Sequence, residues 1–261
     1  MPIIEAFGMR GNVVLGKGEG EKEKDTLVFI HGAGGNYTAW YPQKDHFSRD
    51  FNVVIIELPG HGAARGEGAD KIRRYALWIK GSLDELEIEK PFLIGHSMGG
   101  AITMDLALRF PAIPRGLVLV GTGARLRVDP RILNGIGEDF QKTVEFICEL
   151  AFSKNASQEM VRVAIEEMKK NQPDILHGDF TACDLFDIME DIRGIKNPTL
   201  VICGDQDVLT PVTYSRYLAE KIPGAQLIII EGAGHMIMLE KPEEFNKKLE
   251  LFFRSIDRGD G

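Results

Sequence analysis

The sequence of 261 residues predicts an α/β fold, a doubly wound and mostly parallel sheet with a helical cap. Short apolar runs rich in β-branched residues recur along the chain, and longer amphipathic segments separate them. Between residues 122 and 195 this alternation stops, and only helical periodicity remains. Alternating strands and helices favour a parallel sheet with right-handed crossovers, so the long helical stretch is expected to be an insertion.

Six apolar runs predict the strands of the sheet. They lack the polar alternation of a strand with one wet face, so we expect helices to cover both faces. Amphipathic segments at about 72–87, 98–110, 212–221 and 243–254 predict four of those helices. Residues 3–15 are expected to add an N-terminal hairpin. The strand-like runs are 27–30, 53–56, 92–94, 117–120, 200–202 and 227–230.

The helical stretch is expected to lie over the carboxyl ends of the strands, where open α/β sheets bind ligands. Asp129 followed by Pro130 predicts a helix start, because proline is favoured in the first helical turn. We therefore divide the chain into a core of residues 1–121 and 196–261 and an inserted helical cap of residues 122–195. A set of ordinary crossover helices is the alternative, but the stretch is longer than one crossover needs.

Charge and composition argue against several kinds of partner. The formal net charge is −8 and no basic patch is visible, so we expect neither nucleic acid nor an anionic membrane as partner. No run approaches the roughly 20 apolar residues of a membrane span, and residues 1–5 lack the pattern of a signal peptide. The three cysteines fit neither a zinc motif nor a disulfide framework. These features predict a cytoplasmic protein.

The strongest local motif is Gly-His-Ser-Met-Gly, which runs from Gly95 to Gly99 between a strand-like run and a helical segment. A tight strand-to-helix turn lifts such a serine out of the sheet, and side chains at the glycine positions would collide there. We therefore predict that Ser97 is a nucleophile and that the amide of Met98 donates to an oxyanion. A glycine-rich turn with a surface serine is the alternative.

A second glycine-rich loop, His-Gly-Ala-Gly-Gly, begins at His31 directly after the first apolar run. Glycines allow the backbone to approach a ligand closely, so an amide here, which we expect to be that of Ala33, would complete an oxyanion hole with Met98. The loop lacks the lysine and hydroxyl residue of a phosphate-binding loop, so no nucleotide site is predicted. His31 itself is expected to be structural.

Two further loops follow late strands and carry an acid and a histidine. Asp205 and Asp207 come after the run at 200–202, where a carboxylate can fix the tautomer of a histidine. His235 lies in a glycine-flanked loop after the last strand, a suitable place for proton transfer. The order serine, aspartate, histidine matches one known arrangement of these groups. By themselves the residues leave both aspartates open.

Together these motifs make the sequence similar to the α/β-hydrolase superfamily over nearly its whole length, and it resembles bacterial and archaeal carboxylesterases with a helical lid. The family pattern Gly-x-x-Asp-x-x-x-Pro falls on Gly204, Asp207 and Pro211, so the resemblance selects Asp207 rather than Asp205. A Leu-Pro-Gly-His-Gly segment also matches the family, and there the resemblance implies a structural role for its histidine, His61.

The resemblance implies a serine hydrolase that needs no metal and no organic cofactor, but it does not specify the substrate. The apolar residues of the helical stretch and the absence of a strongly cationic core motif favour a carboxylesterase for neutral esters of small to medium acyl groups. Ser97 would attack a small-molecule ester while His235 accepts its proton, and an acyl-enzyme would follow. Thioester or lactone hydrolysis remains open with the same residues. Dehalogenases and epoxide hydrolases of the family are disfavoured, because they place an aspartate at the position of Ser97.

Two alternatives remain from the sequence. Carbon–carbon bond hydrolases share the Ser-Met-Gly-Gly sequence and act on diketone or dienol acids, for which Arg125, Arg127 or Arg131 would supply a cation. The alternative without a role in binding is that these arginines are solvated or pair with local acids such as Asp129. A slow ligand-binding receptor of the same fold is the alternative from another class, and a complete set of catalytic groups argues against it.

Overall fold

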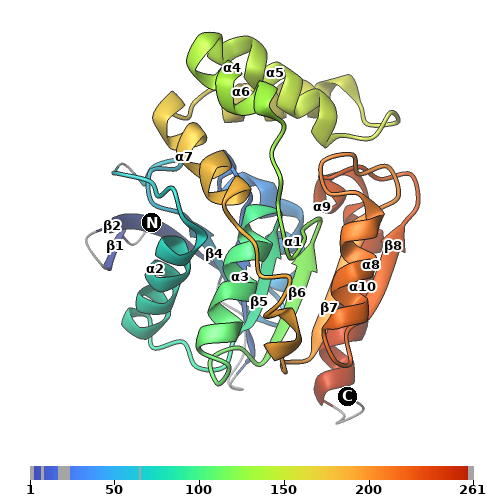
Figure 1. The fold of residues 1–261 in the computed structure, drawn as a ribbon. Coiled ribbons are helices and arrows are strands. Elements are labelled where there is room, and N and C mark those ends of the chain that lie inside the picture. Colours follow the sequence, from blue (N-terminus) through green and yellow to red (C-terminus); the bar gives the residue numbers. More distant parts are fainter. Residues whose placement is uncertain (1–2, 7–8, 17–23, 65, 258–261) are drawn as a thin grey trace.

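The computed structural model describes residues 3–6, 9–16, 24–64 and 66–257, which contain one sheet with helices on both faces (Figure 1). Its strand order is β1-β2-β4-β3-β5-β6-β7-β8. The pairs β1–β2 and β2–β4 are antiparallel and the other neighbouring pairs are parallel, which confirms the predicted fold class. The strands are β1 (Ile3–Ala6), β2 (Met9–Gly16), β3 (Thr26–Ile30), β4 (Asn52–Glu57), β5 (Phe92–His96), β6 (Gly116–Val120), β7 (Thr199–Gly204) and β8 (Gln226–Ile230).

All six apolar runs form strands, β3 to β8, and the expected N-terminal hairpin is the pair β1–β2. The central strands β5 and β6 are buried along their whole length, because helices cover both faces. The strand β8 is only partly buried, since it forms an edge of the sheet. The expectation of strands covered on both faces thus holds for the central strands, whereas the run at 227–230 forms the partly exposed edge strand β8.

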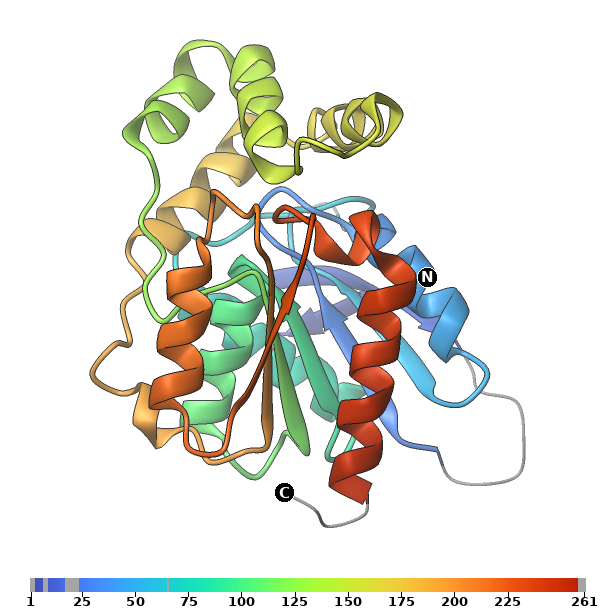
Figure 2. The ribbon, with the colours of Figure 1, turned by 90° about the vertical axis from the view of Figure 1, so that its right-hand side faces the viewer.

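Helices cover the two faces of the sheet in two groups (Figures 1 and 2). One face carries α2 (Ile72–Glu85), α3 (Met98–Arg109) and α8 (Val212–Lys221). The other carries α1 (Tyr41–Phe47) and α10 (Pro242–Asp257). The sequence analysis did not predict α1, because a helix of two turns is too short for a clear apolar period. The remaining short elements outside the cap are η1 (Tyr37–Trp40), η2 (Ile192–Gly194) and α9 (Ile237–Glu240).

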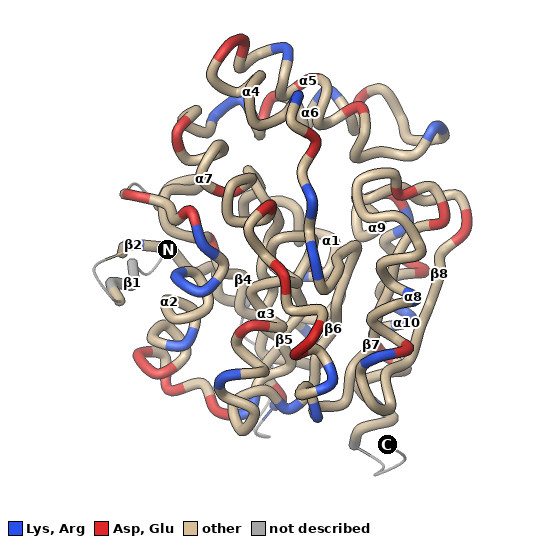
Figure 3. Tube along the Cα trace, in the orientation of Figure 1, with Lys and Arg blue, Asp and Glu red and all other residues tan. Residues whose placement is uncertain are grey.

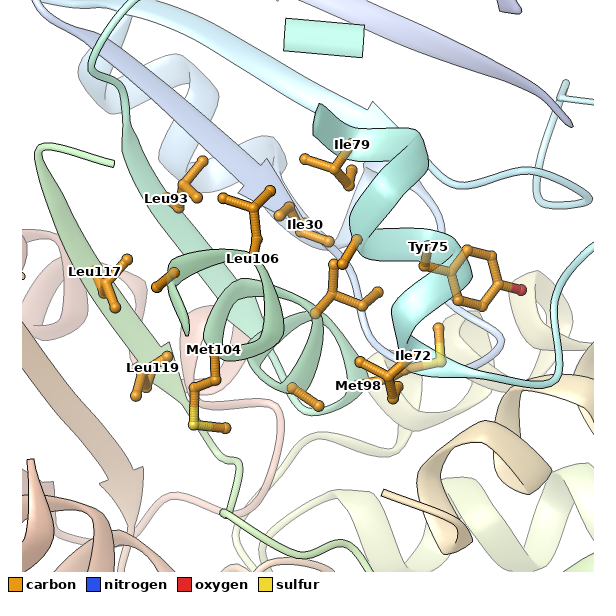
Figure 4. Packing of buried hydrophobic residues seen from close by; sticks show 14 of the residues in the cluster. Ile30, Ile72, Tyr75, Ile79, Leu93, Met98, Met104, Leu106, Leu117 and Leu119 are labelled. Atoms are coloured by element: carbon orange, nitrogen blue, oxygen red, sulfur yellow. The ribbon is translucent and has the colours of Figure 1, made fainter. Parts of the chain in front are cut away.

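The core consists of two apolar clusters, one on each face of the sheet. In the first, Ile30 and Leu93 from the strands meet Ile72 and Ile79 of α2 (Figure 4). Met98, at the start of α3, packs among them with no exposed surface. Burying each such side chain contributes about 1.5–3 kcal/mol, so this layer holds α3 firmly against the sheet. The serine turn that precedes Met98 therefore rests on a rigid base.

Four helices between β6 and β7 stand beyond the carboxyl ends of the strands (Figure 1), and we call them the cap helices. A third apolar cluster, which includes Ile136, Val144 and Leu176, holds them together. The predicted helix start at Pro130 is confirmed, and the Asp129 side chain caps the helix by accepting a hydrogen bond from an amide. The division of the chain at residues 122 and 195 stays a prediction. The cap helices are α4 (Pro130–Glu138), α5 (Phe140–Ala151), α6 (Gln158–Met168) and α7 (Pro173–Asp184).

Charged residues lie on the outer helices and on the cap helices, with both signs mixed (Figure 3). The central strands β3, β5 and β6 carry no Asp, Glu, Lys or Arg. Within the described ranges, no helix is both long enough and apolar enough to cross a membrane. The cysteines, Cys148, Cys183 and Cys203, are all buried and unpaired.

Candidate active site

Ser97 occupies the sharp turn between β5 and α3, at the carboxyl end of a central strand. Its backbone has φ 52° and ψ −115°, a conformation that L-residues rarely adopt and that costs about 1–3 kcal/mol. Hydrogen bonds of the backbone hold the turn. The Ser97 amide donates to the Val120 carbonyl at 2.9 Å, and the Ser97 carbonyl accepts from the Gly100 amide at 2.9 Å and from the Thr122 hydroxyl at 2.8 Å. The strain is therefore maintained by the neighbouring strand and helix.

Glycine is required on both sides of this serine for a steric reason. A Cβ atom at Gly95 would overlap the Gly99 carbonyl, and one at Gly99 would overlap the carbonyl of Ile30 in the next strand. The sequence analysis expected this collision. Helix α3 can thus start directly against β3 and β5, with its N-terminus beside Ser97.

His235 and Asp207 come from the loops after β8 and β7 and form a buried pair. Nδ1 of His235 donates to Oδ2 of Asp207 over 2.8 Å. Asp207 also accepts hydrogen bonds from the Leu209 amide at 3.0 Å and from the Thr210 amide and hydroxyl at 2.8 and 2.7 Å. Burial raises the pKa of Asp207, but the attraction to His235 and these hydrogen bonds outweigh burial and lower the pKa overall. The carboxylate therefore stays charged.

The other aspartate of this loop, Asp205, has a different partner. Its carboxylate is exposed and accepts a hydrogen bond of 2.7 Å from the amide of Gly232. It therefore braces the loop that leads to His235, while Asp207 contacts the imidazole itself. The two aspartates, of which the family pattern selected Asp207, thus have different partners in the structure.

Ser97 and His235 line one cavity of about 290 Å³ beneath the cap helices. Among the hydrogen bonds of the described residues, none joins the Ser97 hydroxyl directly to His235. Catalytic hydrogen bonds of this kind are often long without a bound substrate and tighten when one binds. The structure therefore brings the predicted nucleophile, base and acid to the same place.

Of the two predicted oxyanion donors, one lines this cavity and the other is next to a residue that does. Ala33 lines it, and Met98 directly follows Ser97 at the N-terminus of α3. Neither backbone amide makes a hydrogen bond to another described residue, so both remain able to donate. The side chain of Met98 is buried among core residues (Figure 4), which leaves its amide as the group available to the site.

Two buried histidines close to the site are neutral. His31 donates from Nδ1 to the Gly32 carbonyl at 2.8 Å and accepts the Leu58 amide at Nε2 over 3.1 Å. Burial and the nearby His61 lower the pKa of His31 to about 3. The His96 ring is tilted against the His235 ring with 4.5 Å between the centroids, and burial followed by the repulsion from His235 lowers the pKa of His96 well below 6.5. His31 thus has the structural role expected of it.

The sequence analysis missed a buried carboxylate, Asp179 of helix α7, which reaches from the cap helices into the core. It accepts hydrogen bonds from the Gly34 amide at 2.8 Å, from Nε2 of His61 at 2.7 Å and from the Tyr75 hydroxyl at 2.7 Å. Burial lowers the pKa of His61, but the charge of Asp179 and its hydrogen bond raise it overall. Asp179 therefore fixes the loop next to Ala33.

A signal for Asp179 was present in the sequence. Leu176 and Cys183 precede and follow it by three and four residues, so it lies on the apolar face of its own helix. A lone acid at such a place implies a buried partner, because burying an unpaired charge is costly. The partners themselves lie more than 100 residues away for His61 and Tyr75 and could not be read from the pattern.

A second missed carboxylate, Glu240 of α9, connects the histidine loop to the cap helices. It accepts the Gly234 amide at Oε1 and the Ser153 amide at Oε2, each at 2.9 Å. The backbone adds to this contact, since the amides of His235 and Met236 donate to the Ala151 carbonyl at 2.8 and 3.2 Å. The position of His235 thus depends directly on the end of α5.

The three arginines proposed as cation candidates lie differently. Arg127 and Arg131 line the Ser97 cavity, whereas Arg125 does not. Arg131 makes three side-chain hydrogen bonds to Asp129, at 2.6–3.2 Å. Arg127 lies 3.9 Å from a carboxylate oxygen of Asp187 and donates to a backbone carbonyl. Arg127 and Arg131 thus both have local partners, as the interpretation without a role in binding predicts.

With this geometry, the fold and the site define a hydrolase class. The chain belongs to the alpha/beta hydrolase family, whose model matches residues 27–248. That match extends from β3 into α10 and includes every residue of the candidate site described above.

Several relatives are similar over almost the whole chain. The solved structure of a thermophilic esterase is 37% identical and covers 98% of this chain and 97% of its own, with a TM-score of 0.85. Est816, described as an N-acyl homoserine lactone degrading enzyme, is 28% identical and covers 96% and 100%, with a TM-score of 0.86. A putative carbamate hydrolase of Agrobacterium fabrum, RutD, is 27% identical over 92% of this chain and 97% of its own. These relatives are similar over almost the whole chain, but their names refer to different substrates.

Proposed function

We propose that this protein is a serine hydrolase that cleaves neutral carboxylic esters of small to medium acyl groups through an acyl-enzyme. The observation that carries the proposal is the meeting of Ser97, in its strained turn, with the hydrogen-bonded pair of His235 and Asp207 at one cavity. The identity of 37% to a thermophilic esterase over nearly the full length supports an ester as the bond that is cleaved.

In the proposed reaction the Ser97 hydroxyl attacks the ester carbonyl while Nε2 of His235 accepts its proton. Asp207 keeps Nδ1 protonated, so Nε2 carries the free electron pair. The amides of Ala33 and Met98 donate to the oxyanion, and one such donor contributes about 3–4 kcal/mol to the transition state. His235 then returns the proton to the departing alkoxide, and Ser97 is left acylated.

Water completes the proposed cycle. His235 takes a proton from a water molecule, which attacks the acyl carbonyl and forms a second oxyanion in the same hole. Collapse of this intermediate breaks the bond to the serine oxygen, and the proton on His235 returns to Ser97. The products are a carboxylic acid and an alcohol, and the side chains return to their starting states.

A carbon–carbon bond hydrolase is the second candidate, because Arg127 and Arg131 line the cavity of Ser97 and could bind an acidic substrate. Both guanidinium groups already face acids of the chain, Asp187 and Asp129. A carboxylate substrate would have to compete with these pairs. We therefore place esters first and expect charged dienol acids to be cleaved slowly.

Covalent labelling of the nucleophile tests the proposed function. A fluorophosphonate should form one adduct, on Ser97, and should stop hydrolysis of p-nitrophenyl acetate. Ser97→Ala should fold normally and lose roughly three or more decades of kcat/KM, the scale of triad loss in serine hydrolases. Peptide mass spectrometry locates the adduct, and initial rates measure the loss.

The matched control is Ser255→Ala, because Ser255 lies on α10, outside the candidate site, and its hydroxyl donates to the Phe252 carbonyl of the same helix. This variant should be labelled and should turn over as the wild type does. An adduct on another serine, or a Ser97→Ala protein with wild-type rates, would contradict the assignment of the nucleophile.

A further inference from the structure

A second and larger cavity lies between the cap helices and the core. Its volume is about 650 Å³, more than twice that of the cavity that Ser97 lines. The core contributes the segment from Gly34 to Pro42, together with Met236 and Leu239, and the cap contributes parts of α5 and α6. This volume falls in the range of small-molecule binding sites.

The two cavities border one another along three segments of the candidate site. The residue pairs at 33–34, 150–151 and 235–236 each contribute one residue to either side. Ala33, Leu150 and His235 line the Ser97 cavity, and the next residue of each pair lines the larger one. The oxyanion loop, the histidine loop and the end of α5 therefore all meet where the two cavities adjoin.

The larger cavity is apolar and adaptable. Three methionines line it, Met160 and Met168 from α6 and Met236 from the histidine loop. Unbranched methionine side chains fill irregular space and adjust to apolar groups of different shape. Val163 and Tyr41 also line it, with 46% and 41% of their surface exposed, although large apolar side chains are usually buried. Such a surface binds an apolar group.

The charged groups of this cavity already have partners within the chain. Glu159 pairs with Arg162 at 2.6 Å, and Glu167 pairs with Lys170 at 2.6 Å and accepts a hydrogen bond from Asn36 at 3.1 Å. No unpaired charge among the described lining residues therefore calls for an ionic ligand. The charges at the Ser97 cavity are paired as well, but its lining is more polar, because Arg127, Asp129 and Arg131 lie there beside Ser97, Thr210 and His235.

From this contrast we infer that the larger cavity holds a long apolar arm of the ester, while the Ser97 cavity holds a shorter and more polar arm. This inference rests on the proposed function, because the arms are defined by a carbonyl bound over Ser97. It assigns the substrate class as esters with an alkyl or aryl group of medium length on one side. Either the acyl or the alcohol part can be that arm, and the experiment distinguishes the two.

Two series of neutral esters test the inference. One lengthens the acyl part, from p-nitrophenyl acetate to p-nitrophenyl octanoate, and the other lengthens the alcohol, from ethyl acetate to octyl acetate. The wild type should prefer the longer member at least tenfold in kcat/KM in one series. Ala39→Phe on the core side and Ala164→Phe on the cap side should each lower that long-to-short ratio at least tenfold, because both residues line the larger cavity.

Ala156→Phe is the matched control, because Ala156 precedes α6 and lines neither cavity, and it should leave the ratio unchanged. Variants from opposite walls guard against the misfolding of either one. Hydrolysis of short esters with the same chain-length ratio in wild type and both cavity variants would overturn this inference and leave the proposed function intact. Failure of every ester, with no label on Ser97, would overturn both.

Discussion

The cap helices contact the catalytic loops at two places, and the two contacts are built from different chemistry. At the oxyanion loop, side chains of the cap reach down to the core: Asp179 accepts the Gly34 amide, and Asn171 donates to the Gly34 carbonyl over 2.8 Å. At the histidine loop, the cap contributes backbone instead, through the Ala151 carbonyl and the Ser153 amide. The same task of holding a loop is thus performed by a charged side chain on one side and by main chain on the other.

This difference determines how each contact responds to change. A contact made by the cap backbone survives most substitutions in the cap, so the core partner Glu240 is its sensitive residue. A contact made by a buried carboxylate is lost when that one residue changes, because its partners are then left buried and unpaired. Substitutions on the oxyanion side should therefore lower the free energy of unfolding most. Substitutions on the histidine side should lower kcat most.

The largest effect is expected on the histidine side. Asp207→Asn should lower kcat by about 10⁴-fold, because an amide favours the wrong tautomer of His235 while the geometry is kept. Asp205→Asn is the matched control two residues away, and it should retain most activity because Asp205 accepts a hydrogen bond from a loop amide and makes none to His235. Steady-state rates measure both. Equal losses of kcat in the two variants would show that activity depends on the structure of the Asp205–Asp207 loop and not on the hydrogen bond between Asp207 and His235.

On the oxyanion side, Asp179→Ala should cost about 3–5 kcal/mol of stability, since it removes one partner of a buried ion pair and leaves the donors of Gly34, His61 and Tyr75 without their acceptor. The activity of the folded fraction should fall up to about 100-fold, because the loop beside Ala33 loses its anchor. Urea unfolding measures the first effect and kcat the second. Asp174→Ala, on the exposed first turn of the same helix, should cost at most about 1 kcal/mol. If both variants are equally stable, Asp179 is not an anchor.

Glu240→Gln should have a smaller effect. The variant keeps the shape of the side chain, but its amide nitrogen would face one of two N–H donors, from Gly234 or Ser153. One hydrogen bond is lost, which costs about 1–3 kcal/mol, and kcat should fall several-fold as the histidine loop loosens. Glu243→Gln, exposed at the start of α10, is the control and should change neither quantity. If Glu240→Gln has the same stability and kcat as Glu243→Gln, the backbone contacts alone are enough to hold the histidine loop.

The pH dependence of stability gives the smallest and most specific test. The folded pKa of His61 lies above 6.5, so its stabilising charge is fully present below that pH and is lost as pH rises through the folded pKa. The unfolding free energy of the wild type should therefore exceed that of Asp179→Asn most below about pH 6.5, and the difference should shrink as the pH rises through the folded pKa of His61. A difference that grows with pH would exclude a charged His61.

The contribution of Asp207 to stability depends on pH in the opposite direction. Its pKa is lowered in the folded state, so its contribution is present above about 3.8 and is lost as the pH falls through the folded value. The two sides of the site are therefore expected to weaken at opposite ends of the pH scale. The pH profile thus tests the comparison without any variant in the histidine loop.

Much of this molecule could be predicted because the signals are local. A continuous apolar run such as that of β6 identifies a central strand without reference to its neighbours in space. The glycines around Ser97 are required by the turn itself, and Pro130 begins a helix because its ring already has the helical φ. Helix α1 was missed because it is only seven residues long, and its place is set by packing against the sheet.

The sequence by itself determined the strands, the serine turn and the chain order of Ser97, Asp207 and His235, because each depends on neighbouring residues. Only the tertiary structure decided which distant groups form hydrogen bonds with those loops. Asp179 and Gly34 are separated by 145 residues, and Ser153 and Glu240 by 87. Such partners are set by the way the cap helices dock on the core, and docking depends on the summed packing of many side chains rather than on any local pattern.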